Sequence, residues 1–331
     1  MNAVENAMFD ELSLEKIEET RERLGDRVDR TPAIQWQGSE LKSKIGDDVE
    51  VFVKLELFQR TGTFKARGAM NVMLNLSKEQ LAKGITAVSA GNHAIAAAYC
   101  ARKMGTTAKI FMPKVAKALR IKRARDFGAE LIFCETQAEM FELAEQVQRD
   151  EGRTFVHPFD GPFTLQGTAT AGLEFSEQVP ELDAMILPIG GGGLCGGFAS
   201  ALKQVWPNIK IYGVEPEGSN TMSLSFAKGE AVRKNDVKSI ADSLSPPMAE
   251  AYTYSVCQEF VDEIVLVSDD EMREAMRTIF YDLKLAVEPA GAATTAALCG
   301  PLKGRFANQR VGVITCGTNI DIEDFYAIVG Q

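Results

Sequence analysis

The chain has 331 residues, of which 45% are hydrophobic and 25% are charged, and its formal net charge is -10. This length and apolar content suffice for one large or two moderate globular domains and exclude a disordered or fibrous chain. The acidic balance disfavours nucleic acid as a partner, because binding to phosphates depends mainly on Lys and Arg.

The amino-terminal sequence carries no recognisable targeting signal. The stretch MNAVENAMFDELS is acidic where a signal or transit peptide would be basic, and no apolar run approaches the ~20 residues of a membrane span. We therefore expect a cytoplasmic protein that does not bind membranes. The cysteines form no CxxC pair and His93 and His157 are the only histidines, so neither a disulfide framework nor a histidine metal cage is expected.

The predicted elements alternate between helices and strands along the chain. An amphipathic pattern predicts a helix at 13–25, and another is expected at 268–284, where Ser268 and Glu271 have the spacing of a capping box. Continuous apolar runs predict strands at 51–57, 108–113, 130–134, 184–189, 210–216, 263–267 and 311–316. Because such runs indicate strands covered on both faces, the expected fold class is α/β with mainly parallel sheets.

Three expected turns between a strand and the following helix have unusual compositions: SAGNHA at 89–94, GGGGLCGG at 190–197 and CGTNID at 316–321. In open parallel sheets, ligands bind at the carboxyl ends of the strands, where such turns lie. These three turns are therefore the candidate binding segments.

The most informative turn contains Gly190, Gly191, Gly192 and Gly193. Consecutive glycines allow successive N–H groups to point at one centre, and a helix that starts near Leu194 would add its dipole, so a phosphate is the expected guest. No GK[ST] follows, and the position does not suit a dinucleotide fingerprint, so ATP and NAD are disfavoured. A compact phosphate ester is the predicted ligand.

Lys65 lies in the stretch TGTFKARGA, beside Phe64 and a run of small residues. Most lysines of this kind are solvated helix residues. A lysine held among apolar groups, however, loses its proton more readily and can attack a carbonyl. The stretch by itself leaves both interpretations open.

As a set, these segments resemble the β-family, or fold type II, of pyridoxal phosphate enzymes, and within it the threonine and serine dehydratases and serine racemases. The resemblance runs through RTPA, TGTFKARGA, VSAGNHA, HPFDGP, QGTATAGLE, PIGGGGLCGG, GVEPEG, IADSL, AVEPAGAA and TCGTNID. It implies two three-layer α/β domains, as in the tryptophan synthase β-subunit, with the cofactor in the cleft between them. The larger domain would comprise 1–70 and 158–331, and the smaller, mobile domain 71–157.

The resemblance implies roles for single residues toward pyridoxal 5'-phosphate. Lys65 would be the catalytic lysine that forms a Schiff base with the cofactor, and Phe64 would pack on a face of the pyridine ring. The glycines at 190–193 and the backbone at Leu194 would hold the phosphate.

Further roles concern the polar edge of the cofactor ring. Asn92 would hydrogen-bond the ring hydroxyl, and Cys316 would lie beside the pyridine nitrogen. A thiol is a weak partner that leaves this nitrogen essentially neutral, which still suffices for β-elimination. Glu288 and Asp242 match acidic positions near the cleft of the family, and Glu288 is expected to contact the cofactor. The loop that would receive the substrate carboxylate comprises Ser89, Ala90, Gly91, Asn92 and His93.

The implied activity is elimination of water from a β-hydroxy amino acid, L-threonine or L-serine, to give a 2-oxo acid and ammonia, with Lys65 as the base. Serine racemase is the nearest alternative, but its second base is a serine in an SSGNH loop, and Ala90 stands there in this chain. A 3-hydroxyaspartate dehydratase remains open, whereas the SAGNHA loop disfavours a β-replacement enzyme. A non-catalytic sensor of a phosphate ligand is a hypothesis of another class, and it would be expected to lack Lys65.

Glu215 matches a glutamate with which some family members bind a divalent cation. The residues after it include Ser219 and Thr221 but no aspartate, and hard cations prefer carboxylates, so metal binding is disfavoured.

The turn HPFDGP at 157–162 leaves two interpretations open. Phe159 and Asp160 are either substrate contacts or parts of a surface turn, and His157 is expected to be structural. The segment GPFTL at 161–165, between HPFD and QGT, is shorter than usual for the family, which would reshape the wall of the active site.

The resemblance also implies a homodimer that acts on a small amino acid. The chain ends soon after TCGTNID, so a regulatory domain and feedback control by isoleucine are not expected.

Overall fold

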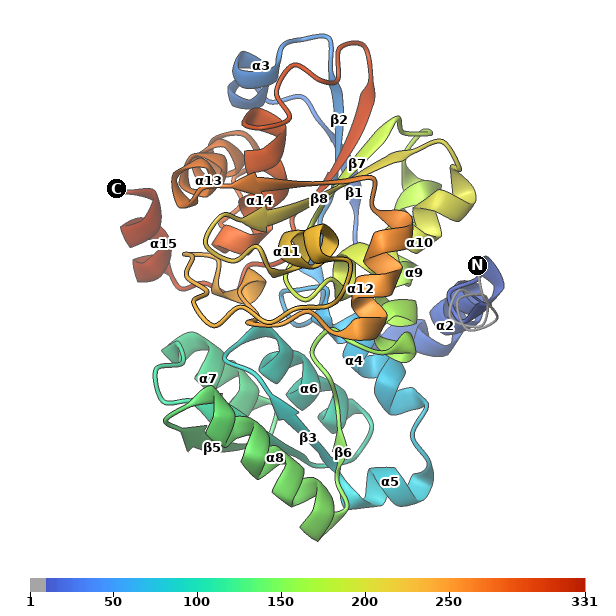
Figure 1. The fold of residues 1–331 in the computed structure, drawn as a ribbon, viewed down its shortest axis with the longest axis vertical. Coiled ribbons are helices and arrows are strands. Elements are labelled where there is room, and N and C mark those ends of the chain that lie inside the picture. Colours follow the sequence, from blue (N-terminus) through green and yellow to red (C-terminus); the bar gives the residue numbers. More distant parts are fainter. Residues whose placement is uncertain (1–9, 331) are drawn as a thin grey trace.

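Residues 10–330 are described by the computed structural model, and they form two β-sheets with helices packed on them (Figure 1). A six-stranded sheet has the order β1-β2-β10-β7-β8-β9, and a four-stranded sheet has the order β5-β4-β3-β6. In Figure 1 the larger sheet lies in the upper half of the view and the smaller sheet in the lower half. The predicted α/β fold class is confirmed.

The larger sheet is parallel except at one edge, where β1 runs antiparallel to β2. Its strands are β1 (Ala33–Trp36), β2 (Glu50–Lys54), β7 (Ala184–Pro188), β8 (Lys210–Pro216), β9 (Glu263–Val267) and β10 (Arg310–Ile314). Five of these strands coincide with predicted apolar runs, although β2 ends before the run at 51–57 does. The strand β1 was not predicted, because two of its four residues are exposed and it has no continuous apolar run.

The smaller sheet is parallel throughout. Its strands are β3 (Ile85–Val88), β4 (Ala108–Pro113), β5 (Glu130–Cys134) and β6 (Thr154–Phe155). All four lie inside the segment 71–157 that the sequence assigns to a smaller domain. The boundaries of that domain and its mobility remain predictions.

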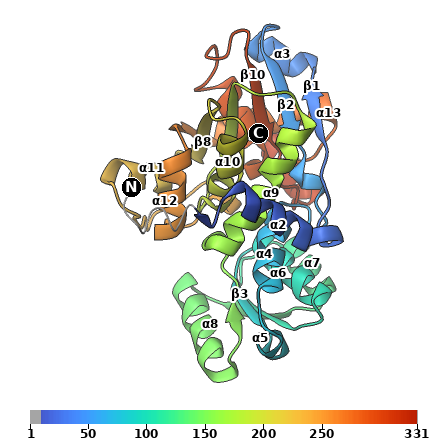
Figure 2. The ribbon, with the colours of Figure 1, turned by 90° about the vertical axis from the view of Figure 1, so that its right-hand side faces the viewer.

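Two groups of helices cover the larger sheet (Figures 1 and 2). One group consists of α2 (Leu14–Leu24), α9 (Pro162–Gln178), α10 (Gly193–Val205) and α12 (Ala251–Phe260), and the other of α3 (Ser39–Ile45), α13 (Asp269–Leu283), α14 (Pro289–Cys299) and α15 (Ile322–Val329). The helix α11 (Thr221–Lys228) follows β8. The predicted helices at 13–25 and 268–284 are confirmed as α2 and α13, and the capping box of Ser268 with Glu271 is present.

The smaller sheet carries α4 (Lys65–Leu74), α5 (Lys78–Lys83), α6 (Asn92–Lys103), α7 (Ala118–Asp126) and α8 (Gln137–Glu151). Separate clusters of buried apolar side chains lie in the two sheet regions: Ile186 and Val313 belong to one, and Ile85 and Ile110 to the other. Since α4 contacts both α6 and α9, it links the two regions, and the candidate lysine is its first residue.

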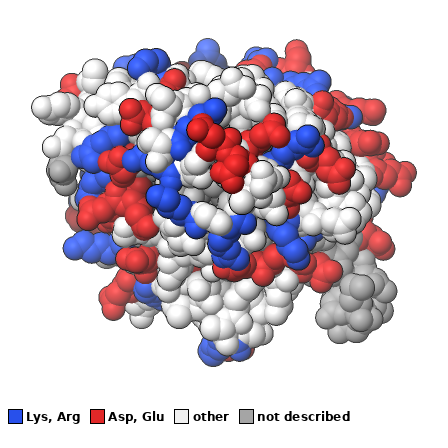
Figure 3. All heavy atoms as spheres, turned by 90° about the horizontal axis from the view of Figure 1, so that it is seen from above, with Lys and Arg blue, Asp and Glu red and all other residues white. Residues whose placement is uncertain are grey.

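The viewed face of the molecule in Figure 3 carries Lys and Arg interspersed with Asp and Glu, and it offers no continuous basic surface. Within residues 10–330, every helix is too short or too polar to serve as a membrane span.

Candidate active site

The turns that follow β3, β7 and β10 converge on one cavity, which we call the inner cavity. Parallel strands bring their carboxyl ends to the same edge of a sheet, so segments far apart in the sequence meet there. Every residue that the sequence analysis assigned to the cofactor lines this cavity: Phe64, Lys65, Asn92, Gly190, Gly191, Gly192, Gly193, Leu194, Glu288 and Cys316. Their grouping is geometric, and their roles remain predictions.

The glycine turn is shaped so that side chains would obstruct it. Gly192 has a φ of 90°, a conformation that other residues rarely adopt, and a Cβ at Gly191 would lie 2.2 Å from the ring of Phe159. Directly after this turn α10 begins at Gly193, and the first turn of a helix leaves backbone N–H groups without partners in the helix. The turn therefore offers N–H donors to an anion at a helix amino terminus.

The amine of Lys65 lies where the inner cavity meets a second cavity. Its Nζ donates a hydrogen bond to the carbonyl oxygen of Pro158 at 2.5 Å and lies 5.0 Å from the centre of the Phe64 ring. Burial lowers the pKa of Lys65 to about 8, although Cys316 and Glu288 act to raise it. A substantial neutral fraction at physiological pH suits an amine that must attack a carbonyl or accept a proton.

Asn92 is held by two partners at the edge of the inner cavity. Its Nδ2 donates to Oε1 of Glu288 at 2.6 Å, and its Oδ1 accepts from Nδ2 of Asn319 at 2.8 Å. The hydroxyl of Ser243 also donates to Oε1 of Glu288, at 3.0 Å. Burial raises the pKa of Glu288, whose other oxygen, Oε2, is buried without a hydrogen-bond partner among the described residues and lies 3.5 Å from Arg120.

Cys316 follows β10 and is buried, and its Sγ donates to the carbonyl oxygen of Ala290 at 3.4 Å. Burial raises the pKa of this thiol far above its ordinary value, so the group facing the inner cavity is neutral. A neutral thiol is what the sequence analysis expects beside the pyridine nitrogen.

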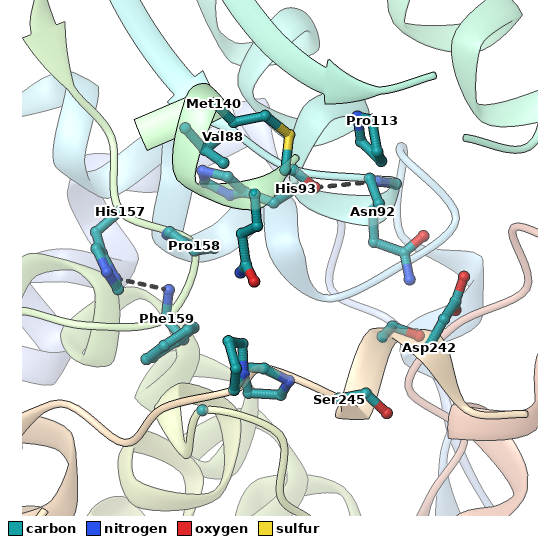
Figure 4. Close-up of a pocket in the computed structure, with 18 of the residues that line it drawn as sticks. Val88, Asn92, His93, Pro113, Met140, His157, Pro158, Phe159, Asp242 and Ser245 are labelled. Atoms are coloured by element: carbon teal, nitrogen blue, oxygen red, sulfur yellow. Dashed lines mark hydrogen bonds between the residues drawn. The ribbon is translucent and has the colours of Figure 1, made fainter. Parts of the chain in front are cut away.

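The second cavity, the outer cavity, has a volume of about 370 Å³ (Figure 4). All residues of the predicted substrate loop line it: Ser89, Ala90, Gly91, Asn92 and His93. This loop leads into α6, whose first residue is Asn92, so a helix amino terminus faces the cavity, as expected for a carboxylate site.

An apolar wall encloses much of the outer cavity. It consists of Val88, Pro113, Met140, Phe141, Phe159, Pro246, Pro247 and Met248. Figure 4 shows Val88 and Met140 on one side of the cavity and Phe159 and Ser245 on the other. Of these residues, only Phe159 was singled out from the sequence, as one of two alternatives. Val88 belongs to the VSAGNHA segment but was given no role, and the segment 246–248 could have been found only through its position shortly after IADSL.

His93 lines the outer cavity but is tied to the fold. Its Nε2 hydrogen-bonds the carbonyl oxygen of Val156 at 2.8 Å, and burial lowers its pKa to about 3. The ring is therefore neutral at physiological pH, and its hydrogen bond fixes the loop at 89–93 to the end of β6. This geometry suits a residue that holds the loop.

The two alternatives for Phe159 and Asp160 are separated by their positions. Phe159 lines both cavities. The carboxylate of Asp160 accepts from the backbone N–H of Thr253 at 3.1 Å and from its hydroxyl, so it fixes the turn to α12.

The lining of the outer cavity includes an ion pair that was not predicted from the sequence. Arg120 on α7 donates two hydrogen bonds to the carboxylate of Asp242, one of them at 3.1 Å from Nη2 to Oδ1. Both residues line the cavity. The two residues lie 122 positions apart in the sequence, and only the fold brings them together.

The carboxylate of Glu215 is hydrogen-bonded to backbone N–H groups. It accepts from the N–H groups of Met222 at 2.8 Å and Ser223 at 2.7 Å, at the start of α11, and burial raises its pKa to about 8. Across residues 10–330, no cluster of three His, Cys, Asp or Glu residues is arranged to hold a metal ion.

The residues that line the inner cavity have the chemistry that pyridoxal phosphate requires. Lys65 supplies an amine for the aldehyde, the turn at 190–193 supplies N–H groups for the phosphate, and Cys316 supplies a neutral partner for the ring nitrogen. Oε2 of Glu288, which accepts no hydrogen bond from the described residues, and the amide of Asn92 supply polar atoms for the ring edge.

Comparisons with known proteins agree with this fit. Residues 26–317 match the family described as "Pyridoxal-phosphate dependent enzyme". The chain is 50% identical over 277 residues to the phenylserine dehydratase of Ralstonia pickettii, which covers 84% of this chain and 85% of that protein. It is 38% identical to the serine racemase of Schizosaccharomyces pombe, over 85% of this chain and 87% of that one.

Among solved structures, the processed form of threonine deaminase isoform 2 from Solanum lycopersicum superposes with a TM-score of 0.87 at 30% identity, covering 96% of this chain and 94% of that chain. The matched segment includes the lysine, the glycine turn and the thiol that line the inner cavity. The chain therefore belongs to the family of pyridoxal-phosphate dependent enzymes.

Proposed function

We propose that this chain is a dehydratase that removes water from a β-hydroxy amino acid with a large apolar substituent, such as phenylserine, and releases a 2-oxo acid and ammonia. The observation that carries the proposal is the position of Lys65, which lines both the inner cavity with its glycine turn and an outer cavity with an apolar wall. A β-phenyl group buries well against such a wall, whereas the small substituents of serine and threonine leave it largely unfilled.

Pyridoxal phosphate, when bound, withdraws electrons from the α-carbon of the substrate and so makes the α-proton acidic. The remaining tasks fall to side chains and backbone. The loop at 89–91 and the amino terminus of α6 bind the substrate carboxylate, and the apolar wall orients the β-substituent.

Lys65 accepts the α-proton, because it is the one amine lining either cavity in the described part of the chain, and His93 and His157 are held neutral by burial. A base whose pKa lies near 8 is well matched to proton transfer near neutral pH.

Racemisation is a second candidate, favoured by the similarity to serine racemases. The residue in the loop where those enzymes are expected to carry a second base is Ala90, which lines the outer cavity but has no proton to donate. Return of a proton to the opposite face is therefore disfavoured, and elimination is the better-supported outcome.

A panel of L- and D-β-hydroxy amino acids tests the proposal, with 2-oxo acid and ammonia measured separately. We expect kcat/KM for phenylserine to exceed that for serine by at least about tenfold, because burial of even one additional methylene group in an apolar pocket gives about that much discrimination. Lys65→Ala should abolish the visible absorbance band of the cofactor and all turnover, whereas the exposed control Lys122→Ala should retain both. Interconversion of serine enantiomers without ammonia would identify a racemase instead, and a wild-type protein without a visible band would favour the phosphate sensor.

A homodimer and a cytoplasmic location, both expected from the sequence, are part of the proposal. Sedimentation of the purified protein tests the first, and cell fractionation tests the second.

A further inference from the structure

The turn at 157–160 lies directly against the amine of Lys65. The carbonyl oxygen of Pro158 accepts the hydrogen bond of the Lys65 Nζ at 2.5 Å. A lysine side chain has four flexible methylene groups, so a fixed acceptor at its tip restricts the directions in which the amine can point. What holds the carbonyl of Pro158 in place therefore controls where the amine of Lys65 lies.

The ring of His157 holds this turn from within. Its Nδ1 accepts hydrogen bonds from the backbone N–H groups of Asp160 at 2.8 Å and of Phe159 at 3.3 Å. An acceptor nitrogen carries no proton, so the neutral ring is protonated at Nε2. These two hydrogen bonds span Pro158, which lies in the chain between His157 and the two donor residues.

Packing and a second anchor restrain the same turn. The ring of His157 makes edge-to-face contacts with Phe155, at 5.8 Å between ring centres, and with Phe159, at 4.6 Å. At the other end, the carboxylate of Asp160 is bonded to Thr253 on α12. Burial lowers the pKa of His157 to about 4, although the charge of Asp160 acts to raise it and that of Lys65 to lower it, so the acceptor form is kept at physiological pH.

We propose that His157 is a positioning residue that fixes the Pro158 carbonyl as the docking point of the Lys65 amine whenever this amine is not covalently engaged. The amine must be free twice: before the cofactor binds, and while it acts as a base on the substrate. This inference rests on the proposed function for the second of these states only. In the first state it concerns the protein without cofactor, and it can be tested there.

Two substitutions separate the acceptor of His157 from its ring. His157→Phe keeps an aromatic ring between Phe155 and Phe159 but removes the acceptor. His157→Asn loses the ring but keeps an acceptor, because an asparagine side chain hydrogen-bonds the backbone N–H two residues ahead in an Asx turn. The two variants control for each other. His157→Phe loses the acceptor but keeps the ring packing, and His157→Asn loses the ring packing but keeps the acceptor.

The first measurement is the rate at which cofactor-free protein regains the visible absorbance band after addition of pyridoxal phosphate. We expect His157→Phe to slow this rate by about tenfold and His157→Asn to stay within about threefold of wild type. The second measurement is steady-state kinetics, in which kcat and KM are determined separately. His157→Phe should lower kcat and leave KM nearly unchanged, because substrate binding uses the loop at 89–93.

An unchanged rebinding rate in His157→Phe would overturn the proposal, and so would His157→Asn being as slow as His157→Phe. If His157→Phe does not fold, Asp160→Ala loosens the same turn from its other end and should slow rebinding by at least about threefold; an unchanged rate in that variant would contradict the proposal equally. Should the wild type bind the cofactor but dehydrate no amino acid, the proposed function would fail while the rebinding test would stand.

Discussion

The guanidinium of Arg67 pairs with the carboxylate of Glu174 through two hydrogen bonds of 2.8 and 2.7 Å inside the protein. It pairs with Glu56 through two more, both of 2.9 Å, and Nζ of Lys54 lies 3.1 Å from Glu174. Two cations and two carboxylates are thus balanced where almost no solvent reaches them. The cluster connects α9 and the segment after β2 to α4. Arg67, its member on α4, lies two residues after Lys65.

Replacing Arg67 with methionine should destabilise the protein strongly. The substitution leaves Glu56 and Glu174 buried with only Lys54 as a cation, and loss of one partner from a buried ion pair typically costs about 3 to 5 kcal/mol. Denaturant unfolding of cofactor-free protein measures this cost. The matched control is Arg305→Met, which breaks a half-exposed pair with Glu263, also held by two hydrogen bonds to one carboxylate, and should cost at most about 1 kcal/mol. Equal losses in the two variants would contradict this account of the cluster.

The reactivity of Lys65 should show its lowered pKa. Only the neutral amine attacks an aldehyde, so the rate at which cofactor-free protein combines with pyridoxal phosphate should rise with pH and level off near pH 8. An ordinary lysine would keep gaining reactivity up to about pH 10.4. The measurement is the initial rate of growth of the visible band at a series of pH values, and a rate that still rises steeply beyond about pH 9.5 would show that burial does not lower the pKa.

Acid should destabilise the protein through the buried His93 and the half-buried His157. Burial lowers the pKa of His93 to about 3 and that of His157 to about 4, from an ordinary value of 6.5. As pH falls below 6.5, the unfolded chain binds protons that the folded chain refuses, so the free energy of unfolding decreases until the folded-state pKa is reached. Each histidine contributes up to about 1.4 kcal/mol per pH unit in this window.

Denaturant unfolding between about pH 6.5 and 4.5 tests this expectation. Carboxylates also titrate in this range, so the informative quantity is the difference between wild type and His157→Asn, which lacks one of the two titrating rings. We expect the variant to lose less stability on acidification. Parallel curves for the two proteins would show that His157 binds its proton equally in both states.

Met140 should set the size of the substituent that the outer cavity accepts. It lies on α8 as part of the apolar wall and is almost fully buried. Met140→Trp should lower kcat/KM for phenylserine by about tenfold or more and change that for serine by less than about threefold, because the added bulk takes the space of the phenyl group. The volume-conserving Met140→Leu is the control and should leave both values nearly unchanged. Equal losses for the two amino acids in Met140→Trp would contradict this placement of the substituent.

Local patterns account for much of the fold that the sequence predicts. Continuous apolar runs matched β5 and β9 residue for residue, and the spacing of Ser268 and Glu271 marked the start of α13. Patterns failed at β1, whose exposed residues break the apolar run, and at β6, which has only two residues. Both strands are defined by pairing with a neighbour rather than by their own composition.

The sequence by itself determined the α/β class and the family, and it singled out Lys65 and the glycine turn at 190–193 as candidates, because these signals depend on residue type and on the order of segments along the chain. Only the tertiary structure decided which side chains meet across the cleft. It brought Met140 and Met248 into one wall, paired Arg120 with Asp242 and placed the carbonyl of Pro158 against the amine of Lys65. Such contacts join segments far apart along the chain, and they arise from the packing of whole helices and sheets, which no local pattern encodes.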